Sequence, residues 1–137
     1  MLLEQYDLAV KCFQDALAIA SQLKHLPLLG NTIGGLGLVF QALGHYEKAI
    51  ECHQQYLAIA QRLDDPAAQI HALSGLGIAY QQLSNLDQAV YMYQQSLEIA
   101  RSIGDRFGEG TALGNLGAAA IELEDYQLQL TILNSIK

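Results

Sequence analysis

Apolar residues recur every three or four positions along most of the chain, and this spacing predicts amphipathic helices. Leu73, Leu76 and Tyr80, for example, share one helical face. No stretch keeps the alternation of apolar and polar residues that a half-buried strand would show. Short breaks interrupt the pattern at regular intervals, and Pro27 and Pro66 both fall in these breaks. The pattern therefore predicts an all-α fold.

The helical pattern returns every 40 residues. The triplet GLG at 35–37 recurs at 75–77 and, as NLG, at 115–117. The tetrapeptide LAIA at 17–20 recurs at 57–60. Because one register holds along the whole chain, the sequence predicts a stack of two-helix units, each packed on its neighbours.

We expect one domain, residues 1–137, with about seven helices. Residues 1–24 form an unpaired second helix, and residues 27–64 and 67–104 form two complete repeats. Residues 107–137 supply a first helix and, after a turn at the sequence LEDY, a truncated and divergent second helix. The predicted architecture is an α-solenoid of antiparallel helix pairs.

Repeated residues of both helices resemble the tetratricopeptide repeat pattern. Leu36 and Gly37 are followed by an aromatic residue three positions on, and Leu76 and Gly77 are followed in the same way by Tyr80. The period of 40, in place of the usual ~34, resembles the longer-helix subtype of kinesin light chains, LGN-type proteins and many bacterial signalling proteins. HEAT and armadillo repeats share the period but lack these positions. The resemblance implies a right-handed superhelix.

The segment FGEGTALGNLG, residues 107–117, suggests a different class of site. Its G-x-G-x-x-x-G spacing resembles a loop that binds the phosphates of a nucleotide. Such a loop must follow a strand, and no strand precedes this segment. It aligns instead with the starts of helices in the earlier units. We therefore interpret its glycines as positions where two helices approach closely.

The net charge and the cysteine content limit the classes of partner and the cellular location that we expect. Seven basic residues against 14 acidic ones give a net charge of −7, which argues against a nucleic-acid surface and an anionic membrane face. There is no apolar run of membrane-spanning length and no secretory signal at the start. Cys12 and Cys52 occupy equivalent repeat positions, which favours core packing over a disulfide. We expect a cytoplasmic protein.

Motifs for catalysis or metal binding are absent from the sequence. The four histidines form no H-E-x-x-H motif, no C-x-x-C is present, and no G-x-S-x-G nucleophile turn occurs. His53 aligns with Phe13 and Tyr93, which indicates a packing position. We therefore predict neither enzymatic activity nor a metal site, and no cofactor.

The family resemblance implies that first helices line a concave groove that holds a peptide of a protein partner. No lysine or arginine falls at the implied groove positions, so a clamp for a partner's terminal carboxylate is not expected. The carboxamides there can pair with peptide N–H and C=O groups at once. The predicted partner-binding residues are Asn31, Leu38, Gln41, His71, Ser74, Ile78, Gln81, Gln82, Thr111, Asn115 and Glu122.

Two functional hypotheses remain open. The first is an adaptor or scaffold module that binds a partner peptide in the groove. The alternative is a self-associating or regulatory fragment of a larger signalling protein, with homo-oligomer contacts through the apolar ends of the solenoid. Leu8, Val10 and Phe13 near the start, and Leu130 and Leu133 near the end, motivate the alternative.

Overall fold

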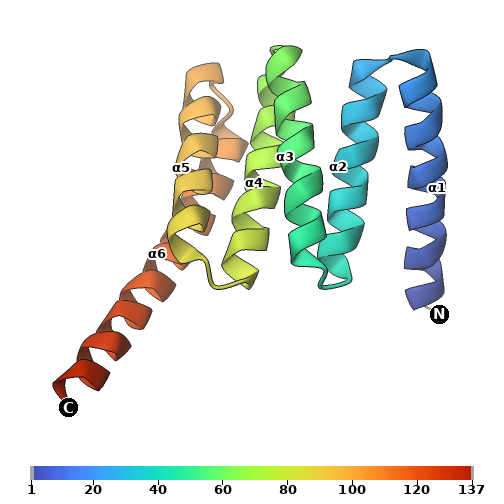
Figure 1. The fold of residues 1–137 in the computed structure, drawn as a ribbon. Helices are drawn as coiled ribbons and strands as arrows, with labels where there is room; N and C mark the ends of the chain where they lie inside the picture. Colours follow the sequence, from blue (N-terminus) through green and yellow to red (C-terminus); the bar gives the residue numbers. More distant parts are fainter. Residues whose placement is uncertain (1, 137) are drawn as a thin grey trace.

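The computed structural model describes residues 2–136, and within this range it contains six helices and no strand. The helices stand side by side in chain order, and the last part of the sixth projects beyond the others (Figure 1). The prediction of an all-α repeat array is confirmed. The helices are α1 (Leu2–Leu23), α2 (Leu26–Ala42), α3 (Tyr46–Arg62), α4 (Pro66–Gln82), α5 (Leu86–Ile103) and α6 (Arg106–Ser135).

Each helix packs mainly on its sequence neighbours, and α2 also contacts α4, which in turn contacts α6. The even-numbered helices therefore form one row, and the odd-numbered helices form another. Core positions are filled by small residues at repeat spacing, including the fully buried Ala20, Ala49 and Ala89. Small side chains at these points allow the helices to approach closely.

Turns between the helices also follow the repeat. Lys24, Asp64 and Gly104 have positive φ and occupy equivalent positions between units. This left-handed backbone ends a helix and satisfies its last carbonyl groups. The next residue in each series caps the following helix by accepting a backbone N–H bond through its side chain. The side chains of His25, Asp65 and Asp105 accept hydrogen bonds from the backbone N–H groups of Leu28, Ala68 and Gly108, respectively.

The expected turn at LEDY does not occur, and the prediction of seven helices is wrong for the described residues. Within each earlier unit a turn forms where Gly44 and Ser84 adopt positive φ. The equivalent residue of the last unit is Glu124, which keeps a helical backbone. Consequently α6 continues unbroken to Ser135, and the predicted second helix is its projecting end. Lys137 lies outside the described residues.

One ring of α3 packs between glycines of the two helices that flank it. His53 of α3 is 2% exposed, and its ring lies against Gly37 of α2 and Gly75 of α4. A Cβ atom built on Gly37 or Gly75 would lie 2.8 or 2.7 Å from His53 Cε1, closer than atoms can approach. The ring of Tyr93 is pressed against Gly77 in the same manner. Ring packing therefore requires Gly37, Gly75 and Gly77, and the interpretation of close helix approach is confirmed for Gly37 and Gly77. It is wrong for Gly117, where nothing lies within 4 Å of a built Cβ atom.

Burial also changes the protonation of His53. Its Nε2 lies 3.1 Å from Gln41 Oε1, which can only accept, so Nε2 carries the proton. Nδ1 is buried and has no hydrogen-bond partner within the described part of the chain. Loss of solvent lowers the pKa of His53 to about 4. The ring is therefore neutral near pH 7.

Replacing Gly77 by alanine should lower the free energy of unfolding by about 1–2 kcal/mol. Overpacking against the buried Tyr93 ring outweighs the gain in helix propensity of up to about 1 kcal/mol. Gly110→Ala is the matched control, because nothing lies within 4 Å of a Cβ atom there. It should raise stability by up to about 1 kcal/mol. Urea unfolding measures both values, and a stabilised Gly77→Ala protein would contradict the packing argument.

Replacing His53 by phenylalanine, the residue found at position 13, should remove one source of acid sensitivity. The folded-state pKa of about 4 lies below the ordinary 6.5, so the unfolded chain binds an extra proton between these pH values. Stability supplied by the neutral ring is therefore complete above pH 6.5 and falls as the pH drops to about 4. Unfolding free energies of both proteins across this range should diverge by up to roughly 3 kcal/mol. Parallel curves would refute the assignment.

Candidate functional site

A groove runs between α2 and α4 and has α3 as its floor. Its middle is a cavity of about 370 Å³, which Asn31 and Leu38 of α2 and Ser74 and Ile78 of α4 line. A second cavity, of about 420 Å³, shares Asn31 and Tyr56 with the first. A third, of about 330 Å³, shares Leu38 and Ile78 with the first. Because adjoining cavities share walls, the three form one groove along the helix pair, which we call the α2–α4 groove.

Most of the predicted partner-binding residues line this groove. Thr111 lines a separate, smaller hollow between α4 and α6, together with His71 and Ser74. Gln81 and Glu122 are bonded to one another, and Asn115 lines none of these cavities. The predicted residues found in the α2–α4 groove are Asn31, Leu38, Gln41, His71, Ser74, Ile78 and Gln82.

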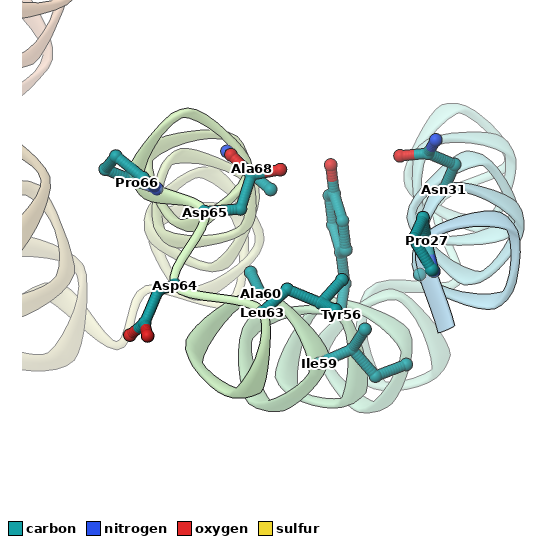
Figure 2. A pocket seen from close by; sticks show the side chains of 11 residues that line it. Pro27, Asn31, Tyr56, Ile59, Ala60, Leu63, Asp64, Asp65, Pro66 and Ala68 are labelled. Atoms are coloured by element: carbon teal, nitrogen blue, oxygen red, sulfur yellow. The ribbon is translucent and has the colours of Figure 1, made fainter. Parts of the chain in front are cut away.

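Tyr56 of α3 is a groove residue that the sequence reasoning missed, because only first helices were considered. Its ring stands between α2 and α4 with the hydroxyl toward the opening (Figure 2). A Cβ atom built on Gly34 would lie 2.8 Å from Tyr56 Cδ2, and one on Gly30 would lie 3.4 Å from Cδ1. The sequence feature that could have indicated this position is the pair Gly30 and Gly34, four residues apart on the helix that packs against Tyr56. They leave the space that this ring occupies.

One end of the α2–α4 groove is acidic. Asp64 and Asp65 line the larger cavity, and no lysine or arginine among residues 2–136 lines any part of the groove. Burial raises the pKa of Tyr56, and the nearby Asp65 raises it further. Figure 2 shows Asp65 beside Ala68, whose N–H it binds at 3.1 Å, while the Asp64 carboxylate points away from Tyr56. This end of the groove is therefore suited to neutral or cationic groups.

A carboxamide on α2 and another on α4 bond a ring of the helix that follows. Gln41 uses its carbonyl oxygen on His53, which leaves its NH₂ group available to donate. In the next unit Tyr93 donates to Gln81 Oε1 at 2.9 Å, and Gln81 Nε2 donates to Glu122 Oε1 at 2.7 Å. Burial and then Glu122 raise the pKa of Tyr93 to about 12, so its hydroxyl stays a donor. Gln81 and Glu122 thus serve an internal network, whereas Gln41 keeps a free donor group.

The described residues offer no metal cluster or membrane-spanning helix as a competing site. Within residues 2–136, no three side chains from histidine, cysteine, aspartate and glutamate gather where they could hold a metal ion. Cys12 and Cys52 are free thiols, and burial raises the pKa of Cys52, with a smaller contribution from Glu51. No helix in the described range combines the length and apolar character needed to cross a bilayer. The α2–α4 groove therefore remains the candidate site.

Comparisons with known proteins agree with the repeat architecture. The crystal structure of BtubC (BKLC) from P. vanneervenii superposes with a TM-score of 0.82 at 23% sequence identity. The match covers 90% of this chain and 52% of the BtubC chain, so this chain spans about half the length of that protein. A search of curated proteins found no match. The tetratricopeptide repeat model matches residues 1–62 and 68–128, and the chain therefore belongs to the tetratricopeptide repeat family.

Proposed function

We propose that this chain is an adaptor or scaffold module that binds a peptide segment of a protein partner in the α2–α4 groove. Tetratricopeptide repeats generally mediate protein–protein interaction. The observation that carries the proposal is the continuity of three cavities along one helix pair. A groove of this length suits a chain segment better than a compact metabolite. As part of the proposal, the stack is a right-handed superhelix with the even-numbered helices on its concave face.

The side chains of the groove suggest how a peptide would be held. Leu38 is 61% exposed and lies beside Ile78, so together they offer an apolar contact for a partner side chain. Asn31 and Gln41 offer carboxamides, which bond the N–H and C=O groups of an extended backbone. His53 on the floor is neutral, because its pKa is about 4. The combination favours peptide backbone recognition with an apolar anchor.

Charge narrows the class of peptide. Within the described part of the chain no cationic side chain lines the α2–α4 groove, and Asp64 and Asp65 lie at one end. A terminal carboxylate would meet no positive partner there and would be repelled at the acidic end. We therefore propose an internal, neutral or basic segment as the ligand. A cytoplasmic location and a role in signalling belong to the same proposal, which includes no catalytic step.

A second candidate function is self-association through the apolar end of the stack. One observation favours it. The part of α6 beyond residue 120 carries seven exposed large apolar side chains, more than a solvated helix requires. They are Ile121, Tyr126, Leu128, Leu130, Ile132, Leu133 and Ile136.

Replacing Leu38 by glutamate should weaken peptide binding at least about tenfold, because it places a charge at the apolar contact of the groove. The probe is a peptide selected on the immobilised chain from a phage-displayed random library and then titrated by fluorescence anisotropy. Leu8→Glu is the matched control, because Leu8 is 62% exposed but lies on α1, outside the groove. An absence of selected peptides, or equal affinity for the Leu38→Glu and original proteins, would refute the groove assignment.

A further inference from the structure

The larger cavity of the α2–α4 groove, about 420 Å³, places an aromatic ring opposite a carboxylate. Tyr56 comes from α3, and Asp65 stands in the turn that begins α4. The ring rests on Gly30 and Gly34 of α2, so its other side is turned toward α4. Figure 2 shows the ring between the two walls, with Asn31 on one side of it and Asp65 on the other. A ligand that enters between Tyr56 and Asp65 therefore meets both groups at once.

The hydrogen-bonding groups of this cavity are only partly used by the protein itself. Asp65 accepts from the N–H of Ala68 through Oδ1, and within residues 2–136 its other oxygen, Oδ2, has no hydrogen-bond or ion-pair partner. In the same range, the Tyr56 hydroxyl and the Asn31 amide bond no other side chain or backbone group. The cavity therefore offers free acceptors to a ligand that donates several hydrogen bonds.

The field in the cavity favours a cation. The charge of Asp65 reaches Tyr56, because it adds to the effect of burial in raising the pKa of that hydroxyl. The last turn of α3 also borders the cavity, and the negative end of a helix attracts positive charge. The N-termini of α2 and α4 act in the opposite sense, but the side chains of His25 and Asp65 already bind an N–H group at each.

The remaining walls can cover the stem of a long side chain. Pro27, Ile59 and Leu63 line the cavity with apolar surface. Arginine and lysine bury their methylene groups against such surface while the charged head reaches a polar group. A bound metal ion does not fit, because among the described residues no three side chains from histidine, cysteine, aspartate and glutamate gather here.

We propose that the larger cavity binds an arginine side chain of the partner peptide, with its guanidinium group between the Tyr56 ring and Asp65 Oδ2. This inference rests on the groove function proposed above and specifies one residue of the ligand. A guanidinium group is planar, so it can stack on the ring while its edge donates to the carboxylate. Asn31, on the other side of the ring, stays available to the peptide backbone. A lysine ammonium group carries no planar face for such stacking.

The next unit shows that a capping aspartate alone does not make this site. Asp105 caps α6 as Asp65 caps α4, and it lies in a smaller cavity of about 200 Å³. At the repeat position of Tyr56, α5 has Ser96, so α5 contributes no ring to that cavity. Phe107 lines it but is 86% exposed and leaves its ring in solvent. The pairing of a supported ring with a carboxylate therefore belongs to the α2–α4 groove.

The ligand side of the contact is tested with peptides selected on the immobilised whole chain from a random phage library. We expect these peptides to share an arginine. In a synthetic copy, replacing that arginine by glutamine should weaken binding at least about tenfold, as measured by fluorescence anisotropy. Replacing it by lysine should weaken binding about threefold or more, because the stacked plane is lost. Selected peptides without arginine, or equal affinity for the lysine or glutamine peptide, would overturn the inference.

Asp65→Asn tests the protein side of the contact. Asparagine caps a helix about as well as aspartate, so α4 should keep its first turn while the cavity loses its charge. Affinity for the arginine peptide should fall at least about fivefold, while affinity for the glutamine peptide should change less than about twofold. Asp105→Asn is the matched control, because it alters a capping aspartate outside the groove and should leave both affinities unchanged. Circular dichroism checks that both variants stay helical.

The outcomes separate this inference from the groove function. If no peptide is selected, both are overturned. A peptide whose affinity falls with Leu38→Glu but not with Asp65→Asn would support the groove and overturn the arginine site alone. Equal losses of the arginine and glutamine peptides on Asp65→Asn would also overturn it, because the carboxylate would then act on another part of the peptide. An equal effect of Asp105→Asn would attribute the loss to net charge, with the same consequence.

Discussion

The packing of the His53 ring between glycines of α2 and α4 determines how closely α2, α3 and α4 approach one another. His53 fills the space between Gly37 and Gly75, and neither glycine can gain a methyl group without displacing the ring. Each mid-helix glycine costs about 1 kcal/mol of helix propensity, and the close contact of three helices offsets this loss. Among the described residues nothing bonds the buried Nδ1, and the burial that the same contact imposes lowers the pKa of His53. Packing and protonation thus have a single cause.

The spacing set by these rings also accounts for the α2–α4 groove. Since His53 touches both α2 and α4, the two helices stand on either side of α3 without closing over it. Tyr56, one turn further along α3, occupies the gap and rests on Gly30 and Gly34. The groove is therefore a consequence of two helices sharing one narrow floor. Larger side chains on the groove-facing side of α3 would therefore change the width of the groove, even if α2 and α4 kept their own side chains.

The sequence was sufficient for the helical repeat and for much of the groove, because both follow from the 40-residue register. Asn31 and Leu38 could be assigned to a groove from the family resemblance and the register together. Tyr56 could not, since its place depends on the space that two glycines leave on another helix. The hydrogen bonds of Gln81 with Tyr93 and Glu122 could not be predicted either, because they join side chains of three different helices. The repeat register predicts which helical face a residue occupies, but it does not predict which side chain forms a hydrogen bond with that residue.

The missing turn near residue 124 shows how a single position can change a module's outer boundary. In a stack of this kind each helix is stabilised by its neighbours, so an uncovered face is tolerated only at an end. Gly44 and Ser84 accept the left-handed backbone that reverses the chain, and Glu124 favours the helix. Reversal would bury Leu133 and Ile136 within one molecule, whereas continuation presents both to solvent. The backbone conformation at position 124 thereby decides whether Leu133 and Ile136 are buried or exposed.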